Sequence, residues 1–329
     1  MSLLRRQFMW LAGAAVAGVA ALSTAWAQSY PTRPVTMIVP FPAGGPTDTV
    51  ARILADRMKM ALGQTVVIEN VSGAGGSIGA GRVARAAADG YTLSIGHVQT
   101  HVINGAVYNL QYDVVTDFEP VSLLADSPQM IVGSNTLPAR DLTQLIAWMK
   151  ANPGKATAGA VGVGGLNDIA AVYFQNQTGT SFQLVPYRGG APLLQDLLAG
   201  QIDLTFGLAA NYLAHVRAGR LKPYAVLART RWWAASEVPT MDEAGVPGFY
   251  ASFWHGLWVP KGTPKDVVAK LNEAMRDALA DPTVRQRFAD IGQDAPPREQ
   301  QTPEALAAQQ KAEIGKWWPI IKTMNIKGE

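Results

Sequence analysis

Residues 35–63 read VTMIVPFPAGGPTDTVARILADRMKMALG and contain one complete strand–turn–helix unit. The short apolar run from Val35 to Val39 is typical of a buried strand. A helix is predicted over residues 47–62, because one of its faces collects the apolar side chains of Val50, Ile53, Leu54, Met58 and Ala61. Gly63 then stands where a helix commonly ends.

The same order of strand, glycine- or proline-rich turn and helix repeats along the chain. Further strands are predicted at residues 65–69, 91–96, 129–133, 157–160, 183–186, 202–206, 223–227 and 256–259. Further helices are predicted at residues 78–88, 141–151, 169–177, 191–199, 212–218, 264–279, 282–291 and 303–324. Strands that alternate with helices indicate an α/β fold whose sheets are largely parallel.

No low-complexity linker divides the chain, so two lobes would be joined by ordinary strands that can act as a hinge. The pattern shifts near Ala125, and residues 229–252 offer a second crossing. We therefore predict a discontinuous first lobe, residues 28–124 and 253–329, and a second lobe inserted as residues 125–252. Each lobe is expected to be a mostly parallel sheet flanked by helices.

The N-terminus has the features of a signal peptide over residues 1–27. Arg5 and Arg6 precede an apolar run, and Ala25-Trp26-Ala27 supplies small residues for cleavage before Gln28. This pattern predicts export to the periplasm by the twin-arginine or the general secretory route. No later stretch approaches the roughly 20 apolar residues that span a bilayer.

Charge and cysteine content exclude several classes of protein. Loss of Arg5 and Arg6 lowers the net charge of +3 to +1, and no basic cluster with interleaved aromatic residues suggests a nucleic-acid partner. The absence of cysteine excludes disulfides and thiolate chemistry. The chain is long enough to bury a core without such cross-links.

Two glycine-rich turns, residues 41–48 (FPAGGPTD) and 160–168 (AVGVGGLND), each lie between a predicted strand and a helix start. Backbone N–H groups at such a turn can bind an anion beside the positive end of the helix dipole. Two turns in different lobes could grip one carboxylate. The alternative is that both are ordinary turns that use glycine for its conformational freedom. Thr47 or Asp48 could also simply cap its helix.

Five stretches carry a family resemblance: residues 39–48 (VPFPAGGPTD), 69–79 (ENVSGAGGSIG), 89–93 (DGYTL), 185–189 (VPYRG) and 238–245 (VPTMDEAG). From about Tyr30 onward the chain resembles the substrate-binding proteins of tripartite tricarboxylate transporters, the Bug family. The resemblance implies a type II periplasmic binding protein, or Venus-flytrap, fold that closes over a small organic carboxylate. It also implies delivery of that ligand, by a receptor expected to be monomeric, to a two-subunit membrane permease.

Carried over by position, the resemblance implies two groups of ligand-binding residues: Phe41, Ala43, Gly44 and Asp48 from the first turn, and Gly162, Gly164, Gly165 and Asp168 from the second. Many relatives carry Ser in place of Gly165, His in place of Asp168 and Asp in place of Gly207. The missing Asp disfavours an amino-acid ligand and favours a di- or aromatic carboxylate. Candidates for the rest of the ligand are His97, Gln99, Tyr187, Asn211 and the site of Gly207. His97 could equally be structural, and Asp48 is expected to be mainly structural.

Catalytic and cofactor patterns are weak. Gly75-Gly76-Ser77-Ile78-Gly79 fits a nucleophile elbow, which leaves an exported serine esterase as an alternative, although a loop rather than a strand precedes Ser77. Otherwise Ser77 would cap a helix. A ligand-responsive partner of a sensor system is a further alternative. His97 and His101 lack a third metal ligand, so neither a metal nor a cofactor is expected. The six tryptophans at 232, 233, 254, 258, 317 and 318 are predicted to lie in the core or between the lobes.

Overall fold

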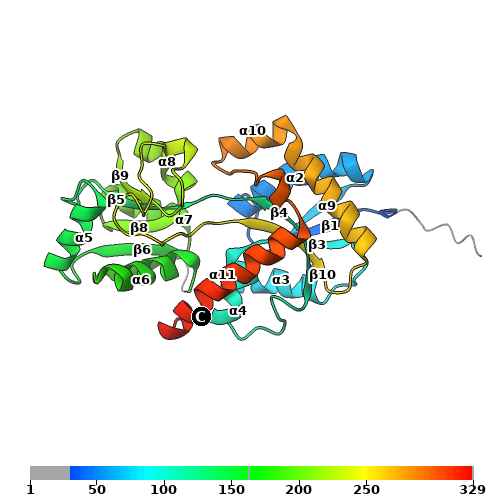
Figure 1. Cartoon of the computed structure of the whole chain (residues 1–329), viewed down its shortest axis with the longest axis horizontal. Coiled ribbons are helices and arrows are strands. Elements are labelled where there is room, and N and C mark those ends of the chain that lie inside the picture. The colour runs from blue at the N-terminus through cyan, green and yellow to red at the C-terminus, as the bar shows by residue number, and fades with distance from the viewer. Residues whose placement is uncertain (1–29, 162–163, 328–329) are drawn as a thin grey trace, which may run out of the picture.

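The computed structural model describes residues 30–161 and 164–327, so the predicted signal segment 1–27 lies outside the described residues. The chain forms two five-stranded sheets that lie side by side along the long axis of the molecule (Figure 1). Across the first sheet the order is β2 (Val66–Asn70), β1 (Val35–Val39), β3 (Thr92–His97), β10 (His255–Pro260) and β4 (Phe118–Ala125). Across the second it is β7 (Gln183–Tyr187), β6 (Thr157–Val161), β8 (Leu204–Leu208), β5 (Gln129–Ser134) and β9 (Leu221–Val226).

Each sheet is mostly parallel and contains one reversed strand, β10 in the first and β5 in the second. The first lobe comprises the first sheet with α2 (Pro46–Leu62), α3 (Ser77–Ala84), α4 (Asn104–Val107), α9 (Lys265–Ala280), α10 (Pro282–Asp290) and α11 (Pro303–Thr323). The second comprises the other sheet with α5 (Leu142–Ala151), α6 (Leu166–Thr178), α7 (Gly190–Ala199) and α8 (Ala209–Arg217). The two-lobed α/β fold predicted from the sequence is therefore confirmed.

The central strands are largely apolar because helices cover both faces of each sheet. Val35, Met37 and Val39 of β1 pack in the cluster that contains α2, α9 and α10, whereas Ile38 points to the opposite cluster. That opposite cluster continues into the second lobe. Within the described ranges, none of the helices has the length and apolarity of a membrane span.

Two connections between the sheets, residues 126–128 and 227–254, are hydrogen-bonded to each other. Residues 126–128 carry the chain from β4 to β5, and the return segment runs beside them. The N–H of Gln129 donates to the carbonyl of Ala251 at 2.9 Å, and that of Phe253 donates to the carbonyl of Ser127 at 2.9 Å. The crossings thus form an antiparallel ribbon rather than two separate tethers.

Helix α11 is a further connection between the lobes. It runs from the first lobe toward the second (Figure 1), where the ring of Trp317 meets Tyr173 edge to face at 6.2 Å. Lys316 donates to the backbone carbonyl of Tyr250. The second lobe therefore packs against a helix of the first as well as being tied to it by the ribbon.

The sequence pattern does not predict β4 or the π-helix η2 (Gln99–Ile103). In β4, Glu119 and Pro120 interrupt the apolar run; the edge position of this strand tolerates the proline. Element ends also shift: the helix predicted at 78–88 ends at Ala84, and the one predicted at 212–218 begins at Ala209. Leu208 precedes that helix without a capping side chain, so its start has no local signal.

Candidate ligand-binding site

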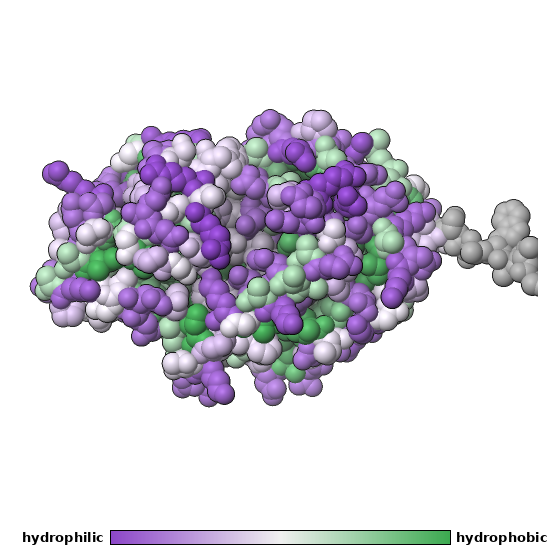
Figure 2. Space-filling model, in the orientation of Figure 1, coloured by the Kyte–Doolittle hydropathy of each residue, from purple (hydrophilic) through white to green (hydrophobic). Residues whose placement is uncertain are grey.

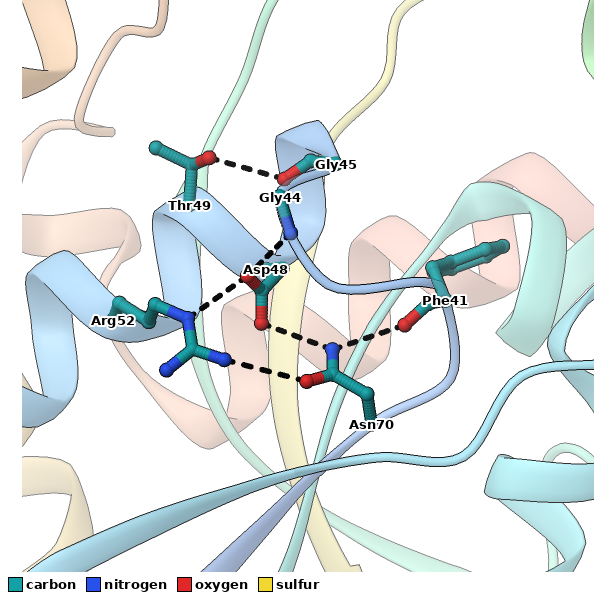
Figure 3. A network of polar contacts seen from close by, with 7 residues as sticks. All are labelled: Phe41, Gly44, Gly45, Asp48, Thr49, Arg52 and Asn70. Atoms are coloured by element: carbon teal, nitrogen blue, oxygen red, sulfur yellow. Dashed lines mark hydrogen bonds and ion pairs between the residues drawn. The ribbon is translucent and has the colours of Figure 1, made fainter. Parts of the chain in front are cut away.

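The first glycine turn, hereafter the first loop, is held by Asp48 from inside the helix (Figure 3). Asp48 is 2% exposed. Its Oδ2 accepts hydrogen bonds from the Gly44 N–H at 2.8 Å and from Arg52 Nε at 2.8 Å, and its Oδ1 accepts from Asn70 Nδ2 at 2.9 Å. Burial raises the pKa of Asp48, but these bonds outweigh it and bring the pKa to about 2. The Asp48 carboxylate therefore holds the first loop in its conformation.

The capping prediction for Thr47 and Asp48 is wrong. Gly45 is the N-cap of α2 and no side chain caps it. Asp48 instead reaches back to the N–H of Gly44, which adopts φ +79°, a left-handed conformation that favours glycine. The N–H groups of Thr47 and Asp48 have no acceptor among the described residues, so they are free for a ligand at the positive end of the helix.

The second glycine turn, the second loop, repeats this geometry. Gly164 has φ +70°, Gly165 is the N-cap of α6, and the Gly164 N–H donates to Asp168 Oδ2 at 3.0 Å. Burial raises the pKa of Asp168, and the bond from Gly164 lowers it by less. The N–H of Asn167 has no acceptor among the described residues. Gly162 lies outside them.

A corner between β3 and η2 joins the two loops. The His97 ring stacks on Phe41 with centroids 4.6 Å apart. Gln99 then crosses to the second lobe: its Oε1 accepts from the Leu166 N–H at 3.1 Å and its Nε2 donates to the Gly164 carbonyl at 3.4 Å. Through His97 and Gln99 the first loop is thus linked to the start of α6 in the second lobe.

His97 presents one hydrogen-bond donor. It is 7% exposed, and burial together with the neighbouring His255 and His101 holds its pKa well below the ordinary value, so the ring is neutral. Its Nδ1 accepts from the Gln99 N–H at 3.1 Å. In a neutral imidazole the proton then resides on Nε2, which has no partner among the described residues. His97 is both packed in the structure and able to donate to a ligand.

A cavity of about 670 Å³ lies between the lobes, where Figure 2 shows a hollow in the surface. Gly44 borders it from the first lobe, Leu208 and Asn211 from β8 and α8 of the second. Trp233 lines it as well and is 51% exposed, so it is not a core residue; its indole N–H contacts Asp294 across the lobes, as predicted for a residue between them.

Two predicted ligand contacts, Gly207 and Tyr187, are not among the residues that line this cavity. Gly207 is buried within β8, and the Tyr212 ring fills the space that a side chain at this position would need. The Tyr187 hydroxyl, on the edge strand β7, donates to Asp196 at 2.6 Å. Sequence reasoning missed Arg217 and Gln293, which line the cavity from the ends of α8 and α10; nothing local marks them, because only the tertiary fold brings them together.

A family model described as the tripartite tricarboxylate transporter family receptor matches residues 50–326. The chain belongs to this receptor family. The match covers most of the described chain, including α2 from Val50 onward, both sheets apart from β1, and α11.

Solved structures of similar proteins share the fold over nearly the whole chain. The periplasmic binding protein BugD is 38% identical with a TM-score of 0.79, covering 91% of this chain and 100% of BugD. MatC of Rhodopseudomonas palustris with bound malate is 38% identical with a TM-score of 0.79, covering 89% of this chain and 100% of MatC. A protein of R. palustris with adipate is 35% identical with a TM-score of 0.80, covering 91% of this chain and 99% of that one.

The surroundings of Ser77 do not match the nucleophile elbow. Strand β2 ends at Asn70, and the 3-10 turn η1 (Ala74–Gly76) stands before the serine. Ser77 is the first residue of α3, whose N-cap is Gly76, so the prediction that Ser77 caps the helix is also wrong. Membership in the receptor family agrees with a binding role. Among the described residues no cluster of His, Asp or Glu could hold a metal ion.

For this receptor we predict that replacing His101 with phenylalanine reduces its sensitivity to acid. His101 is fully buried and stacks on Trp258 at 3.7 Å, and burial lowers its pKa to about 3. In the unfolded chain His101 binds a proton near pH 6.5, whereas in the folded protein it does so only near pH 3. The neutral ring of His101 therefore contributes fully to the free energy of unfolding above about pH 6.5, and this contribution is lost as the pH falls toward 3.

Between pH 7 and pH 5 the free energy of unfolding of the wild type should fall by about 2 kcal/mol more than that of the variant. Urea unfolding at the two pH values measures this difference. Equal losses in the two proteins would show that His101 is protonated in the folded state.

Proposed function

We propose that this protein is a periplasmic receptor that captures a small organic carboxylate between its lobes and delivers it to a tripartite membrane transporter. The observation that carries the proposal is the matched pair of loops. In each, a carboxylate three positions inside the helix (Asp48 or Asp168) fixes a left-handed glycine. N–H groups at each helix start stay without an acceptor among the described residues, and such groups suit one anion.

A di- or aromatic carboxylate is proposed in preference to an amino acid. An ammonium group needs a carboxylate partner, but the Tyr212 ring occupies the space beside Gly207. The ring of Phe41, stacked on His97, offers an apolar face next to the first loop. Malate and adipate are bound by structural relatives of 38% and 35% identity, which supports a carboxylate for this receptor as well.

Lobe closure is proposed to be the signal read by a two-subunit permease. The proposed lobes are residues 28–124 with 253–329, and residues 125–252. Gln99 supports a closed state that is sensitive to ligand, because it already bonds the start of α6 from the opposite lobe. A carboxylate bound at that helix start would therefore change the strength of the hydrogen bond between Gln99 and Leu166.

Thermal unfolding with a panel of acids tests the binding role. At a concentration of 100 times Kd a ligand stabilises the folded state by about 2.7 kcal/mol, so malate, adipate or benzoate should raise Tm by several degrees. Aspartate and glutamate should raise it less. If no organic acid raises Tm while a p-nitrophenyl ester is hydrolysed in a Ser77-dependent manner, the receptor proposal fails and the esterase alternative stands.

A further inference from the structure

The interlobe cavity extends beyond the two loops along helix α8. Its lining residues run from Ala210 and Asn211 in the first turn of α8 to Arg217 in the last. At a rise of 1.5 Å per residue this distance is about 10 Å. Gly44 of the first loop borders the same cavity. A ligand held at the first loop therefore has room for a long remainder beside α8.

Arg217 places a cation at the far end of this cavity. Its Nη2 donates to the carbonyl of Ala234 at 2.7 Å, which orients the guanidinium. Arg217 forms no ion pair with a described residue, and it is the one basic side chain among the described lining residues. The acidic residue in the lining, Asp290, accepts a hydrogen bond from Gln286 at 2.8 Å. A guanidinium whose remaining N–H groups have no acceptor is suited to a carboxylate.

Trp233 and Gln293 also line the cavity. The Trp233 indole N–H donates to Asp294 Oδ1 of the opposite lobe at 2.5 Å, which fixes the ring while half of its surface stays exposed. Gln293 is 2% exposed, and its Oε1 has no partner. The cavity is thus lined by a fixed aromatic ring and by a buried amide oxygen, which can accept a hydrogen bond only from a donor on the ligand.

We propose that the α8 end of the cavity is a second subsite, which binds the distal carboxylate of an elongated dicarboxylate through Arg217 while its flat spacer lies along Trp233. This inference rests on the proposed function, because the first carboxylate must be held at the loops. In this arrangement Arg217 and Trp233 select a ligand by its length as well as by its charge.

Calorimetry with three probes tests the subsite: terephthalate, benzoate and malate. Terephthalate should bind the wild type at least 10-fold more tightly than benzoate, which lacks the second carboxylate. Arg217→Gln should remove most of that advantage and leave benzoate affinity within about twofold, since hydrogen bonds to charged groups are the strong ones. Trp233→Ala should weaken terephthalate more than malate. Arg220→Gln is the matched control, an exposed arginine of the same region that does not line the cavity.

Three results would overturn the inference. If benzoate or malate binds but terephthalate gains nothing from its second carboxylate, the subsite is absent and the receptor function stands. The same conclusion follows if Arg217→Gln and Arg220→Gln have equal effects. If none of the three acids binds the wild type, the proposed function fails together with the inference.

Discussion

Replacing Gly44 with valine should weaken carboxylate binding at least 100-fold while the protein stays folded. Gly44 has φ +79°, where an L-residue is strained by about 1–2 kcal/mol and a β-branched one by more. The loop would relieve this strain by rotating, which moves the Gly44 N–H away from Asp48. The free N–H groups at the start of α2 would then no longer point at the ligand. Calorimetry with the best acid from the panel measures the loss.

Gly63→Val is the matched control for this prediction. Gly63 ends the same helix at φ +67°, and, as at Gly44, a Cβ there would meet no atom within 4 Å. Both variants should therefore carry a similar strain, and Gly44→Val should in addition lose the hydrogen bond to Asp48. Only Gly44→Val should lose affinity. Equal affinities in the two variants would remove the first loop from the binding site.

Asp48→Asn should lower the free energy of unfolding by about 3 kcal/mol, the largest stability effect expected of a single-atom change in this site. Three donors converge on the carboxylate, from Gly44, Arg52 and Asn70. An amide offers one acceptor oxygen and places its own N–H₂ group against a donor. The loop should lose its conformation, and ligand affinity should fall with stability.

The pH dependence of this effect has a defined sign. The pKa of Asp48 is lowered to about 2 in the folded state. Its stabilisation is therefore complete above about pH 4 and is lost as the pH falls toward 2. Urea unfolding should show a constant gap between wild type and variant from pH 7 to 5 and a shrinking gap below pH 4. Asp168→Asn disturbs one hydrogen bond and removes a charge that burial disfavours, so it should lower stability by at most about 1 kcal/mol; a loss equal to that of Asp48→Asn would contradict the network as described.

The strand–turn–helix units were predictable because their signals are local. Val35 to Val39 shows an unbroken apolar run, α2 has one apolar face, and Gly63 ends it as predicted. The two loops could be found for the same reason, since a glycine pair before a helix start is visible in the sequence. The strand β4 was missed because its stability depends on pairing with β10, far along the chain.

The distant wall of the cavity could not be predicted from sequence. Trp233, Gln293 and Arg217 are separated in the chain and meet only because α8 and α10 face each other across the lobes. Gln99 likewise shows nothing in its neighbourhood that predicts a bond to Leu166. In contrast, the absence of a carboxylate at Gly207 can be read from the sequence. That the Tyr212 ring fills the space beside Gly207 depends on side-chain packing.

The hydrogen-bonded ribbon between the lobes has a consequence for affinity. Flexible linkers lose conformational entropy when a ligand draws two domains together, and that loss weakens binding. Here Ser127 is already paired with Phe253, and Gln129 with Ala251, so closure orders no free chain. A ligand that closes the lobes therefore loses less affinity to the ordering of these connections than it would with flexible linkers.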